Sequence, residues 1–127
     1  MGSSLRVPFL KVLIIAGALV ASVAFAQREA SAEPVLSSWY GPGFEGNLTA
    51  SGEVFDPYDY TAASPYLPFG TELLVCYWGC VTVRVNDRGP YVGGRELDLS
   101  QAAADAIGLT AVGVDVVDVT VLRYGSY

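Results

Sequence analysis

The segment that could do chemistry most directly is Asn-Asp-Arg-Gly-Pro at residues 86–90. It follows residues 81–85, in which apolar and polar side chains alternate as they do in a half-buried strand. The Gly-Pro pair at its end favours a tight turn. Because a strand end is rigid and a turn can direct a side chain into a groove, Asp87 is the first candidate for a catalytic acid. The alternative is that Asp87 only accepts backbone N–H groups in its own turn.

The composition limits which side chains could take part in such chemistry. The 127 residues include no histidine, the side chain that titrates near neutral pH without help. Catalytic and metal sites that depend on histidine are therefore excluded, and two cysteines alone are too few ligands for a zinc site. The 13 acidic residues, the tyrosines and the seven Lys and Arg residues remain as acids or bases. We expect neither a metal nor a cofactor.

Residues 1–26 have the pattern of a secretory signal peptide. Arg6 and Lys11 precede an apolar run at residues 12–26, which ends in Ala-Phe-Ala. The alternative is an uncleaved membrane anchor, but the run is shorter than the roughly 20 apolar residues of a bilayer span. We therefore expect a secreted, extracytoplasmic protein of the cell envelope, without stable membrane association after cleavage.

The chain that would remain after cleavage is acidic and small. Five arginines face 13 acidic residues, a net charge of about −8. Such a chain lacks a basic patch for phosphate groups, so nucleic acid is not an expected partner. Its length suits one small domain. We expect residues 27–34 to form a flexible tail and residues 35–127 to form the domain.

Cys76 and Cys80 are the only cysteines. They flank Tyr-Trp-Gly between two apolar runs, which predicts a β-hairpin with a three-residue loop. Outside the cell, an even number of cysteines favours a disulfide. A catalytic thiol would need a base that the chain lacks. We therefore predict a Cys76–Cys80 disulfide that pins the hairpin.

The other segments predict short strands and one helix. Residues 35–40 and 60–63 are extended pieces, and Ser100 can cap a helix that runs to Ile107 and stops at Gly108. In the last strand the valines alternate at 112, 114 and 116 and then shift phase, which predicts a β-bulge. Together with 14 glycines, these short elements favour a small closed barrel.

Six blocks of residues, in order, resemble the RlpA-like (rare lipoprotein A) family. The resemblance covers about residues 36–122 and implies a mainly β fold, a six-stranded double-psi β-barrel related to the barrels of expansins and barwin. The family includes bacterial lytic transglycosylases that cut the glycan strands of peptidoglycan, with a preference for strands stripped of stem peptides. The resemblance thus implies peptidoglycan or a related cell-wall glycan as partner. The blocks lie at residues 38–41, 48–53, 61–63, 67–71, 85–90 and 97–100.

The family pattern, carried onto this sequence, implies active-site roles for Asp87 and Glu53. It also contains a histidine directly after Thr-Ala-Ala, where this chain has Ser64. A serine can hydrogen-bond a sugar or orient a carboxylate, but it cannot exchange a proton near neutral pH. Asp98 falls where related barrels place a second aspartate in the groove, and it points away from the side of its leucine neighbours. Arg88 is either a structural partner of a carboxylate or a contact to substrate.

Lytic transglycosylation can run on carboxylates alone. The 6-hydroxyl of the muramic sugar attacks its own anomeric carbon, so one acid can protonate the leaving oxygen and its conjugate base can take the hydroxyl proton. Our sequence hypothesis assigns both steps to Asp87, with Glu53 tuning or positioning it. Tyr40, Tyr66 and Tyr91 could offer flat faces to sugar rings.

Two other functions remain open at the level of sequence. One is a non-catalytic, expansin-like barrel that binds glycan and loosens the wall, which serine in place of the family's histidine favours. The other is a structural or inhibitory barrel without a glycan ligand. Only a lytic transglycosylase would produce anhydro ends, which distinguishes it from the expansin-like barrel. Only the barrel without a glycan ligand would not be retained on insoluble cell wall.

Overall fold

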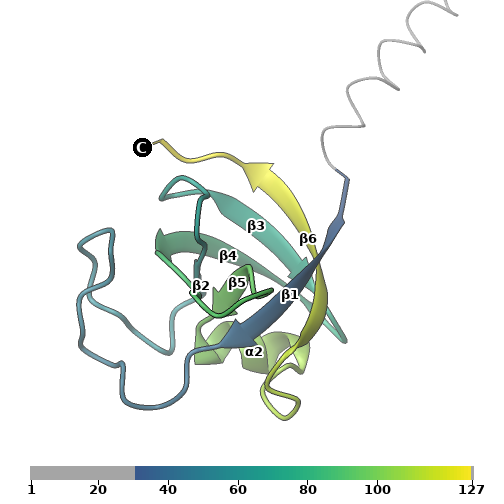
Figure 1. Cartoon of the computed structure of the whole chain (residues 1–127), viewed down its shortest axis with the longest axis horizontal. Coiled ribbons are helices and arrows are strands. Elements are labelled where there is room, and N and C mark those ends of the chain that lie inside the picture. The colour runs from purple at the N-terminus through teal and green to yellow at the C-terminus, as the bar shows by residue number, and fades with distance from the viewer. Residues whose placement is uncertain (1–30, 127) are drawn as a thin grey trace, which may run out of the picture. The chain divides into compact units, whose positions relative to one another are not determined.

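The computed structural model describes residues 31–126 as a closed six-stranded barrel with one short helix (Figure 1). This confirms the predicted mainly β fold. The predicted signal peptide at residues 1–26 lies outside the described residues. The elements are β1 (Glu33–Trp39), β2 (Thr61–Ala63), β3 (Glu72–Cys76), β4 (Cys80–Asp87), β5 (Leu97–Leu99), α2 (Gln101–Ile107) and β6 (Asp115–Arg123).

The strands follow the order β1-β5-β2-β4-β3-β6 around the barrel. The pairs β1/β5 and β2/β4 are parallel, and the other four pairs are antiparallel. A parallel pair needs a crossover connection. Strands β1 and β2 are not paired with each other, and the connection between them is long and extends to one side of the barrel (Figure 1). Residues that are distant in sequence therefore meet where β5 and β2 lie between β1 and β4.

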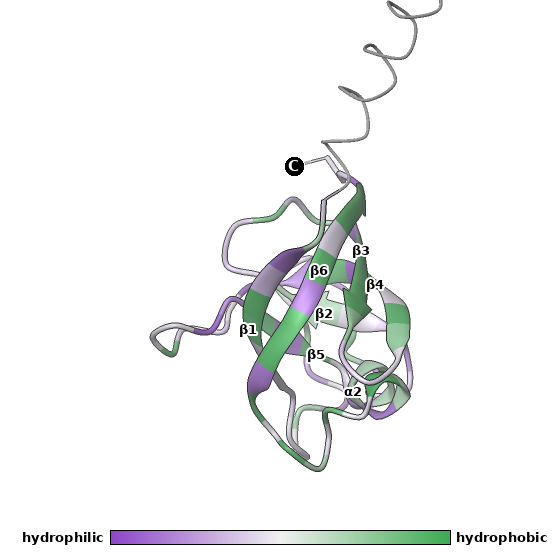
Figure 2. Ribbon diagram, turned by 90° about the vertical axis from the view of Figure 1, so that its right-hand side faces the viewer, coloured by the Kyte–Doolittle hydropathy of each residue, from purple (hydrophilic) through white to green (hydrophobic). Residues whose placement is uncertain are grey.

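The core is built by alternation along the strands. Leu73 and Val75 of β3 face inward with Val83 and Val85 of β4, and all four are at most 1% exposed. Figure 2 shows hydrophobic and hydrophilic residues in turn along the strands, as this alternation requires. The apolar side of α2 completes the same core through small side chains that let it pack closely: Ala103, Ala104 and Ile107.

The helix begins and ends where the sequence predicts. The Ser100 hydroxyl oxygen accepts a hydrogen bond from the Ala103 backbone N–H, 3.3 Å away. Gly108 adopts the left-handed conformation (φ 84°) that ends the helix. The carbonyl oxygen of Ile107, the last helical residue, accepts hydrogen bonds from the backbone N–H groups of Trp78 (3.0 Å) and Gly79 (3.3 Å) at the hairpin tip. The hairpin tip thus caps the helix end.

The predicted disulfide is confirmed. Cys76 and Cys80 face each other at the end of the antiparallel pair β3/β4 and are bonded. The bond closes the hairpin loop that contacts the end of α2. Within residues 31–126 we find no helix with the length and apolar character needed to cross a membrane.

Strand β1 begins two residues earlier than the sequence indicates. Glu33 and Pro34, expected to belong to a flexible tail, pair with Val119 and Asp118 of β6. Pairing to a long neighbouring strand extends β1, and a polar composition does not reveal such a partner.

The bulge predicted at the valine phase shift lies elsewhere. Strand β6 begins at Asp115 and pairs regularly with β1, while Val116 points outward and is 50% exposed. The irregularity in β6 is at Leu122, where Glu72 of β3 pairs with Arg123 and Leu73 pairs with Val121. The phase shift in the sequence arises because Val116 faces outward, and not because β6 contains an extra residue at this point.

Candidate active site

Asp87 is the best-anchored carboxylate of the barrel. Its Oδ1 accepts hydrogen bonds from the backbone N–H groups of Ala50 and Arg88, both at 2.8 Å. Its Oδ2 accepts a hydrogen bond from the Tyr40 hydroxyl at 2.5 Å. The Tyr40 ring stacks on Phe55 with 4.5 Å between ring centroids. Asp87 is therefore held in one orientation by three donors from three parts of the chain.

A second irregularity, in β4, turns Asp87 outward. Ala62 of β2 pairs with Val85 and Ala63 pairs with Asp87, so Asn86 is an extra residue between them. Without the extra residue, alternation from the buried Val85 would direct Asp87 into the core. Bulges redirect side chains in this way next to active sites. The bulge at Asn86 is thus what brings Asp87 to the surface of the barrel.

Asp98 joins Asp87 on that surface. Ala63 pairs with Asp87 on one side and with Asp98 of β5 on the other, and Asp98 pairs in turn with Ser38 of β1. Paired residues on neighbouring strands share a face of the sheet. The two aspartates therefore flank the small side chain of Ala63. The Ser38 hydroxyl donates a hydrogen bond of 3.1 Å to Oδ1 of Asp98.

The pKa of Asp98 is raised from 3.8 to about 6. Burial of the carboxyl group is the main cause, and the negative charge of Asp87 adds to it. The hydrogen bond from Ser38 and the charge of Arg95 act in the opposite direction. Asp98 can therefore carry a proton at mildly acidic pH beside a carboxylate that accepts three hydrogen bonds.

Tyr40 is a hydrogen-bond donor to Asp87. Burial, followed by the hydrogen bond to Asp87, raises the pKa of Tyr40 far above its usual value. Its phenol therefore stays protonated and donates to the Asp87 carboxylate. The role that this geometry supports is orientation of Asp87.

Glu53 lies in a different environment. Its Oε1 is 2.6 Å from Nη1 of Arg84, and its Oε2 accepts a hydrogen bond from the Asn86 side chain at 3.1 Å. The hydrogen bond from Asn86 is the main cause that lowers the pKa of Glu53, with a contribution from Arg84. Glu53 is therefore ionised and fastens the β1–β2 loop to the bulge in β4. The same loop supplies the Ala50 N–H to Asp87.

Ser64 is not on the surface that the aspartates share. It is 1% exposed, and its hydroxyl oxygen accepts hydrogen bonds from the backbone N–H groups of Leu67 (3.1 Å) and Tyr66 (3.4 Å). Its own N–H donates to the carbonyl oxygen of Asp87 at 3.1 Å. The expected sugar contact by Ser64 is thus not supported, because its side chain holds the turn after β2.

Arg88 pairs with backbone carbonyls rather than with a carboxylate. Its Nη1 donates to the carbonyl oxygens of Leu67 (2.7 Å) and Ser64 (3.2 Å). Its guanidinium lies over the Phe69 ring, 4.0 Å from the centroid. The expected carboxylate partner is thus replaced by the turn at residues 64–69, which Arg88 stabilises, and a contact of Arg88 to substrate stays a prediction.

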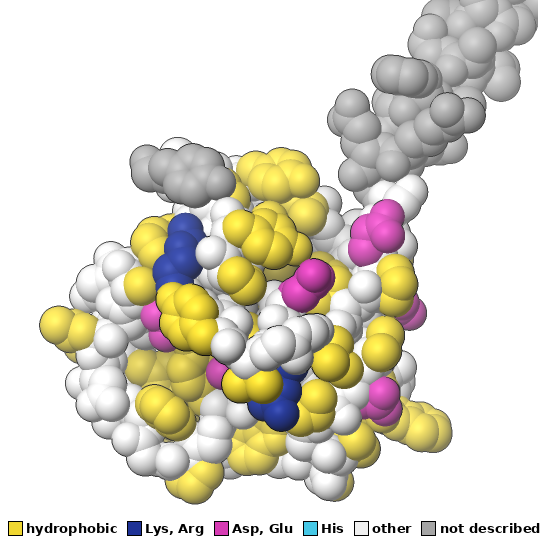
Figure 3. Space-filling view, in the orientation of Figure 1, with side chains coloured by type: hydrophobic (Ala, Val, Ile, Leu, Met, Phe, Trp, Pro, Cys, Tyr) yellow, Lys and Arg dark blue, Asp and Glu magenta, His cyan; other side chains and the backbone are white. Residues whose placement is uncertain are grey.

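Two exposed aromatic residues border the site. Tyr91 is 85% exposed, and its ring lies beside Gly89, where an added Cβ would be 3.6 Å from the ring. Tyr66 is 58% exposed, and partial burial followed by the charge of Glu96 raises its pKa. Both rings remain accessible to a ligand. Figure 3 shows that on one face of the described domain hydrophobic side chains are interspersed with acidic and basic ones.

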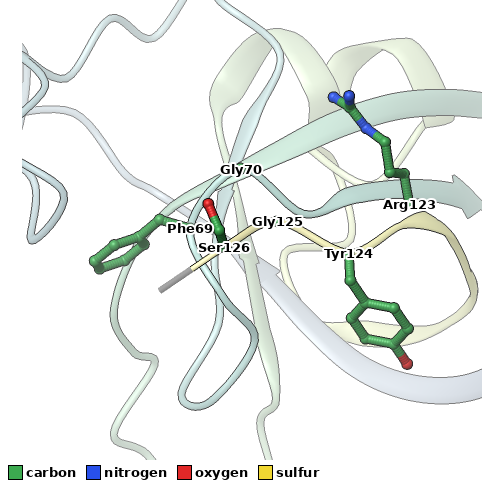
Figure 4. Close-up of a pocket in the computed structure, with 6 residues that line it drawn as sticks. All are labelled: Phe69, Gly70, Arg123, Tyr124, Gly125 and Ser126. Atoms are coloured by element: carbon green, nitrogen blue, oxygen red, sulfur yellow. The ribbon is translucent and has the colours of Figure 1, made fainter.

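A separate pocket of about 350 Å³ lies between the turn before β3 and the segment after β6. In Figure 4 the Phe69 and Tyr124 side chains point away from each other, and the chain at Gly125 passes between them. The Gly125 N–H donates to the Thr71 hydroxyl oxygen at 3.0 Å, which holds this segment to the barrel. The aspartates do not line this pocket, whereas Phe69, on which Arg88 packs, does.

Sequence reasoning missed several residues that build the site. Asn86 and Ser38 lie inside the resembling blocks, so their neighbours could have drawn attention to them. Ala50 also lies inside such a block, but its role as a backbone donor and that of Phe55 as a ring partner are defined only by the folded loop.

The described domain is thus a closed six-stranded barrel with two neighbouring aspartates on one face. Residues 33–121 match the family described as lytic transglycolase, and the chain belongs to this family.

Similar proteins with assigned names share most of the barrel. The chain is 52% identical over 82 residues to the "Probable endolytic peptidoglycan transglycosylase RlpA" of Synechocystis sp., covering 62% of this chain and 26% of that protein. It is 46% identical over 94 residues to the "Endolytic peptidoglycan transglycosylase RlpA" of Campylobacter jejuni, covering 72% and 34%. The chain thus spans about a quarter to a third of the length of these curated relatives. An expansin from Clavibacter michiganensis shares the fold (TM-score 0.59, 22% identity, 76% of this chain and 52% of that one).

Proposed function

We propose that this protein is an endolytic peptidoglycan transglycosylase of the cell envelope, which cleaves glycan strands and leaves 1,6-anhydromuramoyl ends. The observation that carries the proposal is the pair Asp87 and Asp98 on either side of Ala63, with one carboxyl group able to hold a proton. The names of the relatives support peptidoglycan as the substrate.

In the proposed reaction the two aspartates divide the acid and base roles. Asp98 donates its proton to the glycosidic oxygen as the bond to the anomeric carbon of muramic acid breaks. The 6-hydroxyl oxygen bonds to that carbon, and its proton passes to the Asp87 carboxylate. Protons then re-equilibrate between the pair and solvent, and no water is consumed. Two carboxyl groups in unlike environments are a common basis for such a division.

The division differs from our sequence hypothesis, which assigns both steps to Asp87. Three donors hold the Asp87 carboxylate, which suits a base that must be ionised when the reaction starts. Burial of Asp98 suits an acid that must be protonated. Glu53 acts indirectly in this scheme, by holding the loop and the bulge that position Asp87.

The test is the release of anhydro ends from peptide-free glycan strands, measured by mass spectrometry. Asp87→Asn and Asp98→Asn should each lower the rate by about 100-fold or more, the usual contribution of a general acid or base. Asp118→Asn, which changes an exposed carboxylate of β6, is the matched control and should be fully active. Unchanged rates in both site variants would refute the proposed chemistry.

A second candidate is an expansin-like barrel that binds glycan without cleaving it. Serine at the position after Thr-Ala-Ala favours it, because the family pattern has a proton-exchanging histidine there. Retention on insoluble peptidoglycan without any anhydro ends in the products would identify this function.

A further inference from the structure

One cationic side chain near the aspartate pair has no hydrogen-bond or ion-pair partner among residues 31–126. The guanidinium groups of Arg84, Arg88 and Arg123 are each held by carboxylates or carbonyl oxygens. Within the part of the chain that the structure describes, Arg95 is the arginine whose guanidinium forms neither a hydrogen bond nor an ion pair. Its five N–H donors are therefore available to a ligand.

The backbone holds Arg95 at the entrance to β5. Its N–H donates to the carbonyl oxygen of Val92 (3.2 Å) in a turn, and the N–H of the next residue, Glu96, donates to the carbonyl oxygen of Leu36 (3.0 Å). The first bond closes the turn, and the second fixes the chain next to β1, so that Arg95 lies three residues before Asp98. The Arg95 side chain is only partly exposed, and its positive charge acts to lower the pKa of the Asp98 carboxyl group. Arg95 is thus close to the proposed acid on a rigid segment.

The surroundings of Arg95 make an unpartnered cation unusual. Asp87, Asp98 and Glu96 all lie near the site, and the described chain has a large excess of acidic residues. An anionic ligand group would be repelled there unless a cation received it. A guanidinium suits a carboxylate because its paired N–H groups match the two oxygens.

We propose that Arg95 binds the lactyl carboxylate of the muramic acid unit that lies at the aspartate pair. This inference rests on the proposed function, which makes peptidoglycan glycan the substrate. Muramic acid carries a lactyl group whose carboxylate is free when no stem peptide is attached and is an uncharged amide when one is. Arg95 then selects strands by the charge of that group.

The experiment compares two forms of the same peptide-free strands. In one, the lactyl carboxylates are free; in the other, they are converted to N-methylamides, which removes the charge with little change in size. Wild-type protein should show a kcat/KM about 10- to 100-fold higher on the free acid, the usual effect of a hydrogen bond to a charged group. Arg95→Gln should abolish the preference, so that kcat/KM is the same on the free acid and on the amide.

Two further variants control for charge and fold. Arg95→Lys keeps the charge and should retain part of the preference, whereas Arg123→Gln removes a guanidinium that is paired with Glu72 and should retain all of it. Equal kcat/KM of the wild type on both strands, or an undiminished preference in Arg95→Gln, would overturn the inference.

The inference and the proposed function can fail separately. If the wild type releases no anhydro ends from either strand, the transglycosylase proposal fails. Equilibrium binding of the two intact strands then tests Arg95 alone: tighter binding of the free acid that is lost in Arg95→Gln supports its role, and equal binding of both strands refutes it.

Discussion

Replacing Asp98 by asparagine should stabilise this protein at pH 8 and leave its stability nearly unchanged at pH 4. The pKa of Asp98 is raised to about 6 in the folded protein from an ordinary value of 3.8. Between these values the folded state binds more protons than the unfolded state, so stability falls as the pH rises through this window. Above about pH 6 the full cost of the buried charge is present. Asparagine carries no charge and can still accept the hydrogen bond from Ser38.

The magnitude follows from the size of the pKa difference. One pKa unit corresponds to about 1.36 kcal/mol, which gives about 3 kcal/mol as an upper value. Because the Asp98 side chain is partly open to solvent, screening reduces this to about 1–2 kcal/mol. In a domain of this size, such a difference corresponds to a rise in Tm of about 5–15 °C at pH 8.

The assay is urea unfolding of the wild type and Asp98→Asn at pH 4, 6 and 8. The difference in unfolding free energy should grow with pH, while Asp118→Asn should show no such growth. The same variant should lose transglycosylase activity, so a gain in stability would accompany a loss of function. A difference that is independent of pH, or a destabilised variant at pH 8, would refute the account of Asp98 as a buried acid.

Three further outcomes follow from the contacts around the barrel. Asn86→Ala removes the hydrogen bond to Glu53 at the bulge. It should lower the free energy of unfolding in urea by about 1–2 kcal/mol and reduce activity strongly. Wild-type activity in this variant would show that the bulge does not depend on this bond. Replacement of Cys76 and Cys80 by serine should lower the unfolding free energy by about 2 kcal/mol, the value for so short a loop, and an unchanged midpoint of thermal unfolding would contradict this. Gly125→Ala places a Cβ against backbone atoms of the turn before β3 and should cost about 1–3 kcal/mol. Its control is Gly113→Ala, at a glycine with no atom within 4 Å of the added Cβ but a φ of +87°, which should cost about 1–2 kcal/mol through backbone strain alone.

Elements whose signals lie within a few residues were predictable. Ser100 and Gly108 mark the ends of the helix because a cap and a left-handed stop act on adjacent backbone groups. The hairpin and its disulfide follow from the spacing of Cys76 and Cys80. The alternation at residues 97–99 places Asp98 opposite its leucine neighbours, and both leucines are buried.

Other features depend on contacts that the local pattern does not contain. The orientation of Ser64 is set by two backbone N–H groups of the following turn. Arg88 finds carbonyl oxygens there, although its residue type suggests a carboxylate partner. The bulges at Asn86 and Leu122 arise from the register between strands, which a hydrophobic pattern in one strand cannot specify.

The chemical options of this protein can be read from its residues: carboxylates without histidine, an aspartate at the end of a strand, and a small barrel with one hairpin pinned by a disulfide. Which of these carboxylates lie side by side depends on the tertiary structure. Asp87 and Asp98 become neighbours because β2 lies between their strands and presents Ala63 to both. Strands that are distant along the chain pair in this way only in the folded barrel. The register of that pairing leaves the Asp98 side chain partly buried, and burial raises its pKa.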